Sequence, residues 1–165
     1  MGQLAKVEAL KLSIEPPSEI VEGDLIAVRF RTNKPAWLVV YYLEDGGPGM
    51  VIWPSPEEPE PQVTPAAPAV LPSVAELARG IKLQAQLRVP GKPQREALVA
   101  YAFAEKADFD RLKPAIGAQS DDGRKLEAQL KGSIEQLPLS RWTREMVYYV
   151  IEPEDGAGGG APGPR

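Results

Sequence analysis

The chain has 165 residues, 25% of them charged, and a formal net charge of −4. This acidic balance argues against nucleic acid as a partner, because a phosphate backbone is bound by a basic face. The sequence contains no cysteine and no histidine, which excludes disulfides, thiolate nucleophiles, Ser–His–Asp triads and ordinary catalytic zinc sites. We therefore expect a domain that is not an enzyme and carries no cofactor.

Strand patterns dominate the first part of the chain. Residues 7–14 and 24–31 alternate apolar with polar side chains, and residues 36–43 (AWLVVYYL) are apolar on both faces, as is typical of a central strand. Residues 50–53 supply a short partner strand. The intervening EDGGPG is followed by no lysine and runs into no helix, so it predicts a hairpin turn rather than a phosphate-binding loop.

A proline-rich segment follows at residues 54–72 and holds seven prolines. Two PxxP spacings, Pro56 with Pro59 and Pro65 with Pro68, are typical of segments that bind an aromatic groove on a partner. The alternative is a mobile acidic loop between two strands. The segment is the best partner-binding candidate in the sequence.

The second half predicts strands and then helices. Residues 81–89 alternate most cleanly, a PGKP turn leads into a strand at 96–104, and a last strand covers 145–151. Between these last two strands we expect a helix at 107–113 and a second helix capped by Ser120 or Asp121. The apolar stripe of the second helix should lie on a sheet and comprises Leu126, Leu130, Ile134 and Leu137.

This order predicts a mainly β domain over residues 1–152, an immunoglobulin-like β-sandwich of about seven strands with a helical insertion at 107–137. Residues 153–165 form a Gly/Pro tail that should be disordered. Helices are expected only within the insertion.

Aromatic and acidic side chains provide the remaining candidates. Tyr42, Trp53 and Tyr149 are candidates for an exposed recognition surface, and core packing is the alternative for each. The acidic pairs at residues 108/110 and 121/122 lie near helix starts, where capping explains them. No metal site is expected.

The order of features also resembles a bacterial family catalogued as domain of unknown function 4384. The resemblance covers roughly residues 20–112 and rests on the Gly23–Asp24 step, AWLVVYYL, MVIWP, the Leu71–Pro72 pair and PGKPQRE followed by ALVAYAFAEKADF. It implies an accessory module joined to, or encoded near, signalling or envelope proteins, with no catalytic residues. The proline-rich segment and the helical insertion depart from the family pattern.

We expect a non-catalytic module that binds a protein or peptide partner in a bacterial signalling or envelope assembly. The alternative is a small-molecule or glycan sensor with a pocket between the sandwich and the helical insertion, lined by Trp37, Tyr101 or Trp142. No apolar run reaches the ~18 residues of a membrane span. The protein is expected to be cytoplasmic, or else a soluble extracytoplasmic fragment of a membrane-anchored protein.

Overall fold

A computed structural model describes residues 8–15 and 19–154. The protein is mainly β, as the sequence predicts: of the described residues, 41% are in strands and 19% in helices. The elements in chain order are β1 (Leu12–Glu15), β2 (Ile20–Val21), β3 (Leu25–Ile26), β4 (Val28–Thr32), β5 (Ala36–Glu44), β6 (Gly49–Trp53), β7 (Gln62–Val63), β8 (Ala69–Leu71), α1 (Val74–Ala78), β9 (Leu83–Gln84), β10 (Gln94–Phe103), α2 (Lys106–Leu112), β11 (Gln119–Ser120), α3 (Gly123–Ile134), the 3-10 turn η1 (Leu139–Arg141) and β12 (Trp142–Glu152).

The strands form three sheets. The large sheet has the order β11-β6-β5-β10-β12-β2, with β7 added beside the start of β5. Neighbours in it are antiparallel except β12 and β2, which run parallel. The small sheet has the order β1-β4-β8, and β3 with β9 forms a separate two-stranded ribbon.

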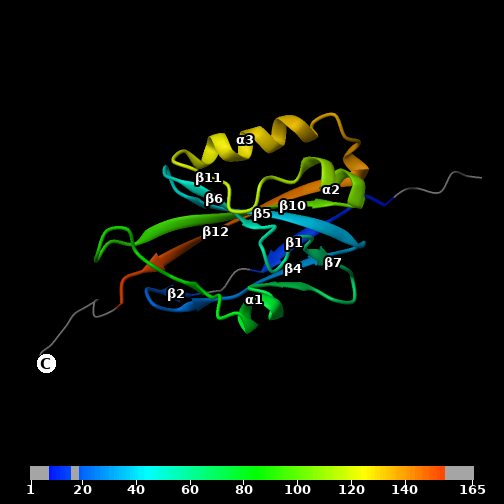
Figure 1. Ribbon diagram of the computed structural model, residues 1–165. Helices are drawn as coiled ribbons and strands as arrows, with labels where there is room; N and C mark the ends of the chain where they lie inside the picture. The colour runs from blue at the N-terminus through cyan, green and yellow to red at the C-terminus, as the bar shows by residue number, and fades with distance from the viewer. Residues whose placement is uncertain (1–7, 16–18, 155–165) are drawn as a thin grey trace, which may run out of the picture.

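Each face of the large sheet is covered by a different layer (Figure 1): α2 and α3 lie on one face, and the small sheet lies on the other. The side chains of β10 alternate between the two resulting cores. Leu98, Ala100 and Ala102 point toward the small sheet, whereas Val99, Tyr101 and Phe103 point toward the helices. A strand covered on both faces has no solvent-facing side, so its sequence is a continuous apolar run.

The helical insertion agrees with its predicted pattern. Leu126, Leu130 and Ile134 of α3 are buried against the helix-side face of the sheet, and Leu137 packs at the edge of the same core. The cap is Asp122, whose side chain accepts a hydrogen bond from the N–H of Arg124, rather than Ser120 or Asp121. The first predicted helix corresponds to α2.

Two predicted elements differ from the structure. The alternating residues 81–89 form only the two-residue strand β9, because β3 ends after Ile26 and offers only two partners in its ladder. The proline-rich segment is not a structureless loop, since β7 and β8 lie within it and bury Val63 and Leu71.

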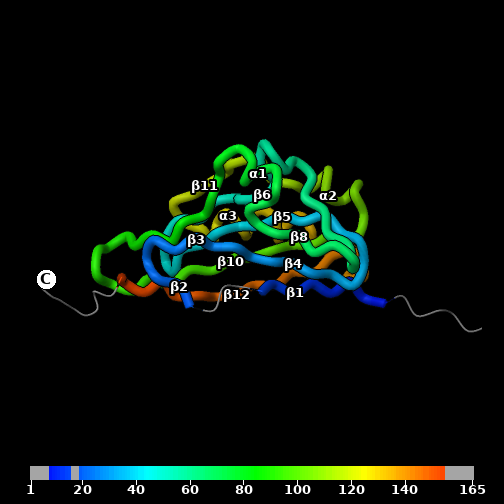
Figure 2. The backbone as a smooth tube through the Cα atoms, turned by 90° about the horizontal axis from the view of Figure 1, so that it is seen from below, coloured from blue at the N-terminus to red at the C-terminus, as the bar shows by residue number. Residues whose placement is uncertain are grey.

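Helix α1 lies outside the insertion, so the expectation that helices occur only there is wrong. Its N-cap is Ser73, directly after the proline-rich segment, and its Glu76 accepts a hydrogen bond from Trp53 of β6. Figure 2 shows the backbone running from β8 into this helix. The predicted strand at 7–14 is β1, displaced toward Glu15. Val7 and most of the predicted tail lie outside the described residues.

Candidate functional site

The four candidate prolines do not form one surface. Pro56, Pro59 and Pro65 are exposed, and Pro68 is half-buried beside β8. Pro56 lines an apolar cleft described below, and the other three do not. Because the proline-rich segment 54–72 contributes strands to two sheets, its shape is fixed by the core.

Two of the three candidate aromatics are buried, so for these two the structure agrees with core packing and not with an exposed recognition surface. Trp53 is 2% exposed because its position on β6 faces the core, where its ring lies 5.6 Å from that of Phe30. Tyr149 is 9% exposed, and its neighbour Tyr148 points to the opposite face of β12 and is exposed instead. Tyr42 is half-buried.

The glycine cluster is a turn, as predicted. It joins β5 to β6, and Gly46 has a φ of 70°, the left-handed conformation that glycine adopts without strain. The turn also receives α3, because the N–H of Gly123 donates to the carbonyl of Gly47 over 3.0 Å. The insertion therefore docks on the hairpin.

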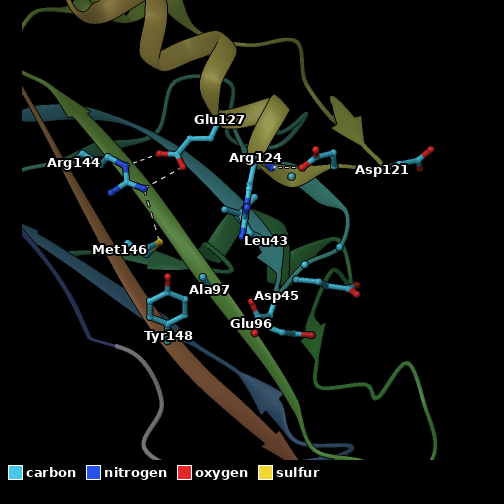
Figure 3. Close-up of a pocket in the computed structure, with 15 residues that line it drawn as sticks. Leu43, Asp45, Glu96, Ala97, Asp121, Arg124, Glu127, Arg144, Met146 and Tyr148 are labelled. Atoms are coloured by element: carbon cyan, nitrogen blue, oxygen red, sulfur yellow. Dashed lines mark hydrogen bonds and ion pairs between the residues drawn. The ribbon is translucent and has the colours of Figure 1, made fainter.

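A groove of about 600 Å³ lies where α3 begins (Figure 3). Leu43, Ala97 and Met146 from three adjacent strands line it, together with Arg124 and Glu127 of α3. Apolar and charged side chains of both signs thus share one open groove.

An ion pair closes one end of this groove. Glu127 accepts hydrogen bonds from Arg144 over 2.5 and 3.0 Å and from the Tyr101 hydroxyl over 2.6 Å. Burial by itself would raise the pKa of the Glu127 carboxyl, but the hydrogen bonds from Arg144 and Tyr101 outweigh burial and lower this pKa. The three side chains satisfy one another's hydrogen-bonding groups and connect α3 to the sheet. We call this set of Glu127, Arg144 and Tyr101 the Glu127 strut.

The groove lies between the sheet and the helical insertion, as the alternative prediction requires, but Trp37, Tyr101 and Trp142 do not line it. Tyr101 is fully buried in the helix-side core, and Trp37 and Trp142 pack against that core. These three aromatics stabilise the layer contact.

The acidic pairs have structural roles. Asp108 is buried and accepts hydrogen bonds of 2.9 and 3.1 Å from Arg141, while Asp110 pairs with Lys106 at 2.8 Å. Capping is confirmed for Asp122 and is wrong for Asp108, whose partner lies 33 residues away along the chain. Within residues 8–15 and 19–154, no three acidic side chains gather in a way that would hold a metal ion.

An apolar cleft of about 250 Å³ opens on the side of β6 that carries α1. Met50, Ile52, Ile81 and Ile116 line it, together with prolines 54, 56 and 72. Val74 and Leu77 stand on the same side of α1, one helical turn apart, and both are exposed.

Three of the apolar side chains that line this cleft are exposed: Met50, Ile81 and Ile116. Val74 and Leu77 do not line the cleft, but both are exposed on α1, the helix whose Glu76 does line it. We call these five residues the cleft rim. Single exposed apolar side chains are common on protein surfaces, whereas a group of them around a concave site marks a binding surface.

A buried carboxylate holds the rim in place. Glu76 of α1 accepts hydrogen bonds from Trp53 Nε1 over 3.1 Å and from the Ser55 hydroxyl over 2.7 Å. It also completes a capping box with Ser73. Side chains on a short helix fixed in this way present a preformed surface.

The sequence contains a signal for α1. Ser73 and Glu76 have the S-x-x-E spacing of a capping box, which predicts a helix start and so places Val74 and Leu77 on one helical face. The contribution of Ile116 has no such signal, since it comes from the loop between α2 and β11.

None of the helices in the described part of the chain has the length and apolar character needed to cross a membrane. Comparison of the chain with protein-family models, with curated proteins and with solved structures finds no significant match.

Proposed function

We propose that the protein is a non-catalytic module that binds a protein or peptide partner, and that the partner docks on the cleft rim. The observation that carries the proposal is that three exposed apolar side chains line one apolar cleft, with two more exposed on the adjoining helix α1. We also propose that the module acts in a bacterial signalling or envelope assembly. This part of the proposal rests on the family resemblance over residues 20–112.

The size of the cleft favours a side chain over a free small molecule. Pockets for drug-sized ligands range from about 300 to 1,000 Å³, and the cleft has about 250 Å³. A partner would place one or two apolar side chains in it and cover the exposed rim residues of α1. Burying each such side chain fully contributes about 1.5–3 kcal/mol.

We also propose that the scaffold is an immunoglobulin-like sandwich with helices added to one sheet. In that fold strand B pairs with A and E, and strands C, F and G form the facing sheet. The orders β1-β4-β8 and β5-β10-β12 agree if these strands are A-B-E and C-F-G, with β6 in the C′ position. Strand β7 departs from the pattern because it pairs with β5. An experimental structure tests this assignment.

The test of partner binding starts from peptides selected from a random display library against the wild-type protein. Their affinity is then measured for Leu77→Ser/Ile116→Ser, which alters the rim, and for Leu25→Ser/Leu139→Ser, a matched pair of exposed leucines away from it. We expect at least tenfold weaker binding by the rim variant, since truncating a central apolar contact costs more than about 1 kcal/mol. The control variant should bind within about twofold of wild type.

Equal affinity of both variants for every selected peptide would refute binding at the rim. A second candidate, a small-molecule sensor, is favoured by the volume of the α3 groove, about 600 Å³. A ligand found by thermal-shift screening would support this candidate if its stabilising effect disappears with Arg124→Glu in the groove and persists in the rim variant.

A further inference from the structure

A pocket of about 600 Å³ lies on the face of the large sheet opposite to α3, against the β3–β9 ribbon. We call it the Glu96 pocket. Its polar lining comprises Tyr42, Glu44, Lys82, Gln84, Gln86, Arg88, Gln94, Glu96 and Tyr149. Its apolar lining includes Ile52 and Leu98.

Glu96 is a buried carboxylate whose hydrogen-bond donors are all neutral. It is 4% exposed, and its carboxylate accepts from the Tyr42 hydroxyl and from Gln94 Nε2, each over 2.5 Å. No ion pair joins Glu96 to a cation in the part of the chain that the structure describes. Burying an anion without a cation is costly.

The strand register brings a second carboxylate to the same place. Glu44 of β5 and Tyr149 of β12 both lie opposite Glu96 of β10. The Tyr42 hydroxyl also approaches Glu44, at 3.2 Å. Burial, the hydrogen bond to Glu96 and the nearby negative charges raise the pKa of Tyr42, so both carboxylates face a protonated phenol.

The chain already places one guanidinium at the mouth of the pocket. Arg88 bonds Glu44 through Nε over 2.8 Å and through its terminal nitrogen. Arg88 belongs to the stretch between β9 and β10, outside any strand, and its side chain is 57% exposed. It contacts Glu44 and does not pair with Glu96.

We propose that the Glu96 pocket binds an arginine side chain of the partner, and that Arg88 occupies the mouth of the pocket when no partner is present. Two carboxylates with phenol hydroxyls beside them match the planar, multi-donor guanidinium group. An incoming guanidinium would replace Arg88 at Glu44 and supply the positive charge that Glu96 lacks.

This inference rests on the proposed function, because the pocket and the apolar cleft share the wall formed by Met50, Ile52 and Leu83. A single extended partner segment can therefore place an apolar side chain in the cleft and an arginine in the Glu96 pocket. The partner motif would be an apolar residue followed or preceded at short spacing by an arginine.

The test uses Nα-acetyl-arginine amide as the probe and monitors NMR shifts during titration. The neutral isostere Nα-acetyl-citrulline amide is the matched control, and Nα-acetyl-lysine amide tests the preference for guanidinium. In Arg88→Ala, which vacates the mouth, we expect saturable binding of the arginine probe with a Kd on the order of 1 mM. Wild type should bind it several-fold more weakly, and the citrulline probe should not bind.

Two further variants identify the carboxylates. Glu44→Gln and Glu96→Gln, each combined with Arg88→Ala, should weaken binding of the arginine probe at least tenfold. Glu44 is only partly buried, so the Glu44→Gln variant should fold. It therefore still tests the proposal if Glu96→Gln does not fold. The proposal is overturned if folded Arg88→Ala shows no saturable shift, or if the arginine and citrulline probes bind alike.

Failure of this inference and failure of the proposed function give different results. If the arginine probe does not bind while the Leu77→Ser/Ile116→Ser variant still loses peptide affinity, only the Glu96 pocket assignment falls. If the probe binds and the rim variant keeps full peptide affinity, the pocket stands and the rim proposal falls.

Discussion

Interior carboxylates in this protein are stabilised in different ways. Glu127 pairs with Arg144, whereas Glu76 and Glu96 are both bonded by neutral groups. The hydrogen bonds of Glu76 fix α1 and complete its capping box, a structural role. Glu96 instead lies opposite a second carboxylate, Glu44, and lines a pocket. This position singles out Glu96 as a residue for function.

The Glu127 strut predicts a pH-dependent contribution to stability. Because the pKa of Glu127 is lowered in the folded state, its stabilising effect is complete above its unfolded value of about 4.3 and disappears as the pH falls through the folded pKa. We expect Glu127→Gln to reduce the free energy of unfolding by about 1–3 kcal/mol at pH 7. The difference from wild type should shrink toward zero as the pH falls through the lowered pKa of the folded state.

Urea unfolding at a series of pH values measures this difference. Glu145→Gln on β12 is the control, since Glu145 is exposed and its variant should track wild type across the series. A deficit of Glu127→Gln that stays constant down to low pH would show that the carboxylate charge contributes nothing.

At the scale of elements, the insertion is held by a close approach of two backbones. A Cβ atom on Gly49 would lie 2.8 Å from the Cα of Gly123 and 2.7 Å from Leu43 Cδ2. Gly49 belongs to β6 and Gly123 is the first residue of α3. The start of the helix therefore sits directly on the hairpin, and this contact also shapes one wall of the α3 groove.

We expect Gly49→Ala to destabilise the protein by about 1–3 kcal/mol, because the added methyl group overpacks a contact that includes backbone. Gly132→Ala is the matched control: a Cβ at this exposed position of α3 meets nothing within 4 Å. It should stabilise the protein by about 0.5–1 kcal/mol through helix propensity. Denaturant unfolding of both variants checks the prediction, and a neutral Gly49→Ala would contradict the close approach.

At the scale of the whole molecule, the proline-rich segment is part of the framework. Its strands β7 and β8 pair with β5 and β4, and Val63 and Leu71 enter the core between the two sheets. Each of these side chains contributes about 1.5–3 kcal/mol by burial. The total stability of a domain is only about 5–15 kcal/mol.

Replacing residues 54–72 by a short Gly/Ser turn should therefore prevent cooperative folding. Circular dichroism in the near-ultraviolet and proton NMR dispersion measure the loss of packed structure. Pro59→Ser/Pro65→Ser, at two exposed positions, is the control and should keep the native spectra at a cost of about 1 kcal/mol or less per site. A folded variant without the segment would show that β7 and β8 are dispensable.

Local pattern was sufficient where one element supplies its own signal. The apolar run at residues 36–43 predicted a central strand, the stripe Leu126, Leu130 and Ile134 predicted a sheet-facing helix, and the glycine cluster predicted a turn. Pattern failed at residues 81–89, where alternation was clean but the partner strand is two residues long. An alternating pattern indicates which side chains lie on the same face. It does not show whether a neighbouring strand is long enough to pair with the whole stretch.

The candidate site was hardly predictable for the same reason. The sequence left recognition and core packing open for Trp53 and Tyr149, and the strand register turns both toward the interior. The cleft rim draws on β6, α1 and the loop before β11, and the Glu96 pocket draws on three adjacent strands and an arginine from a separate segment. No spacing along the sequence predicts that these residues lie together in the fold.

The sequence by itself determined that the protein is mainly β, that its helices lie largely in one insertion, and that thiol and imidazole chemistry are absent. Composition and local periodicity suffice for these conclusions because they depend on single residues and their near neighbours. Tertiary structure alone decided which aromatics are buried, that the proline-rich segment contains two strands, and that Glu96 lies opposite Glu44, which Arg88 bonds. These outcomes depend on which strands become neighbours, a choice made by the packing of the whole chain.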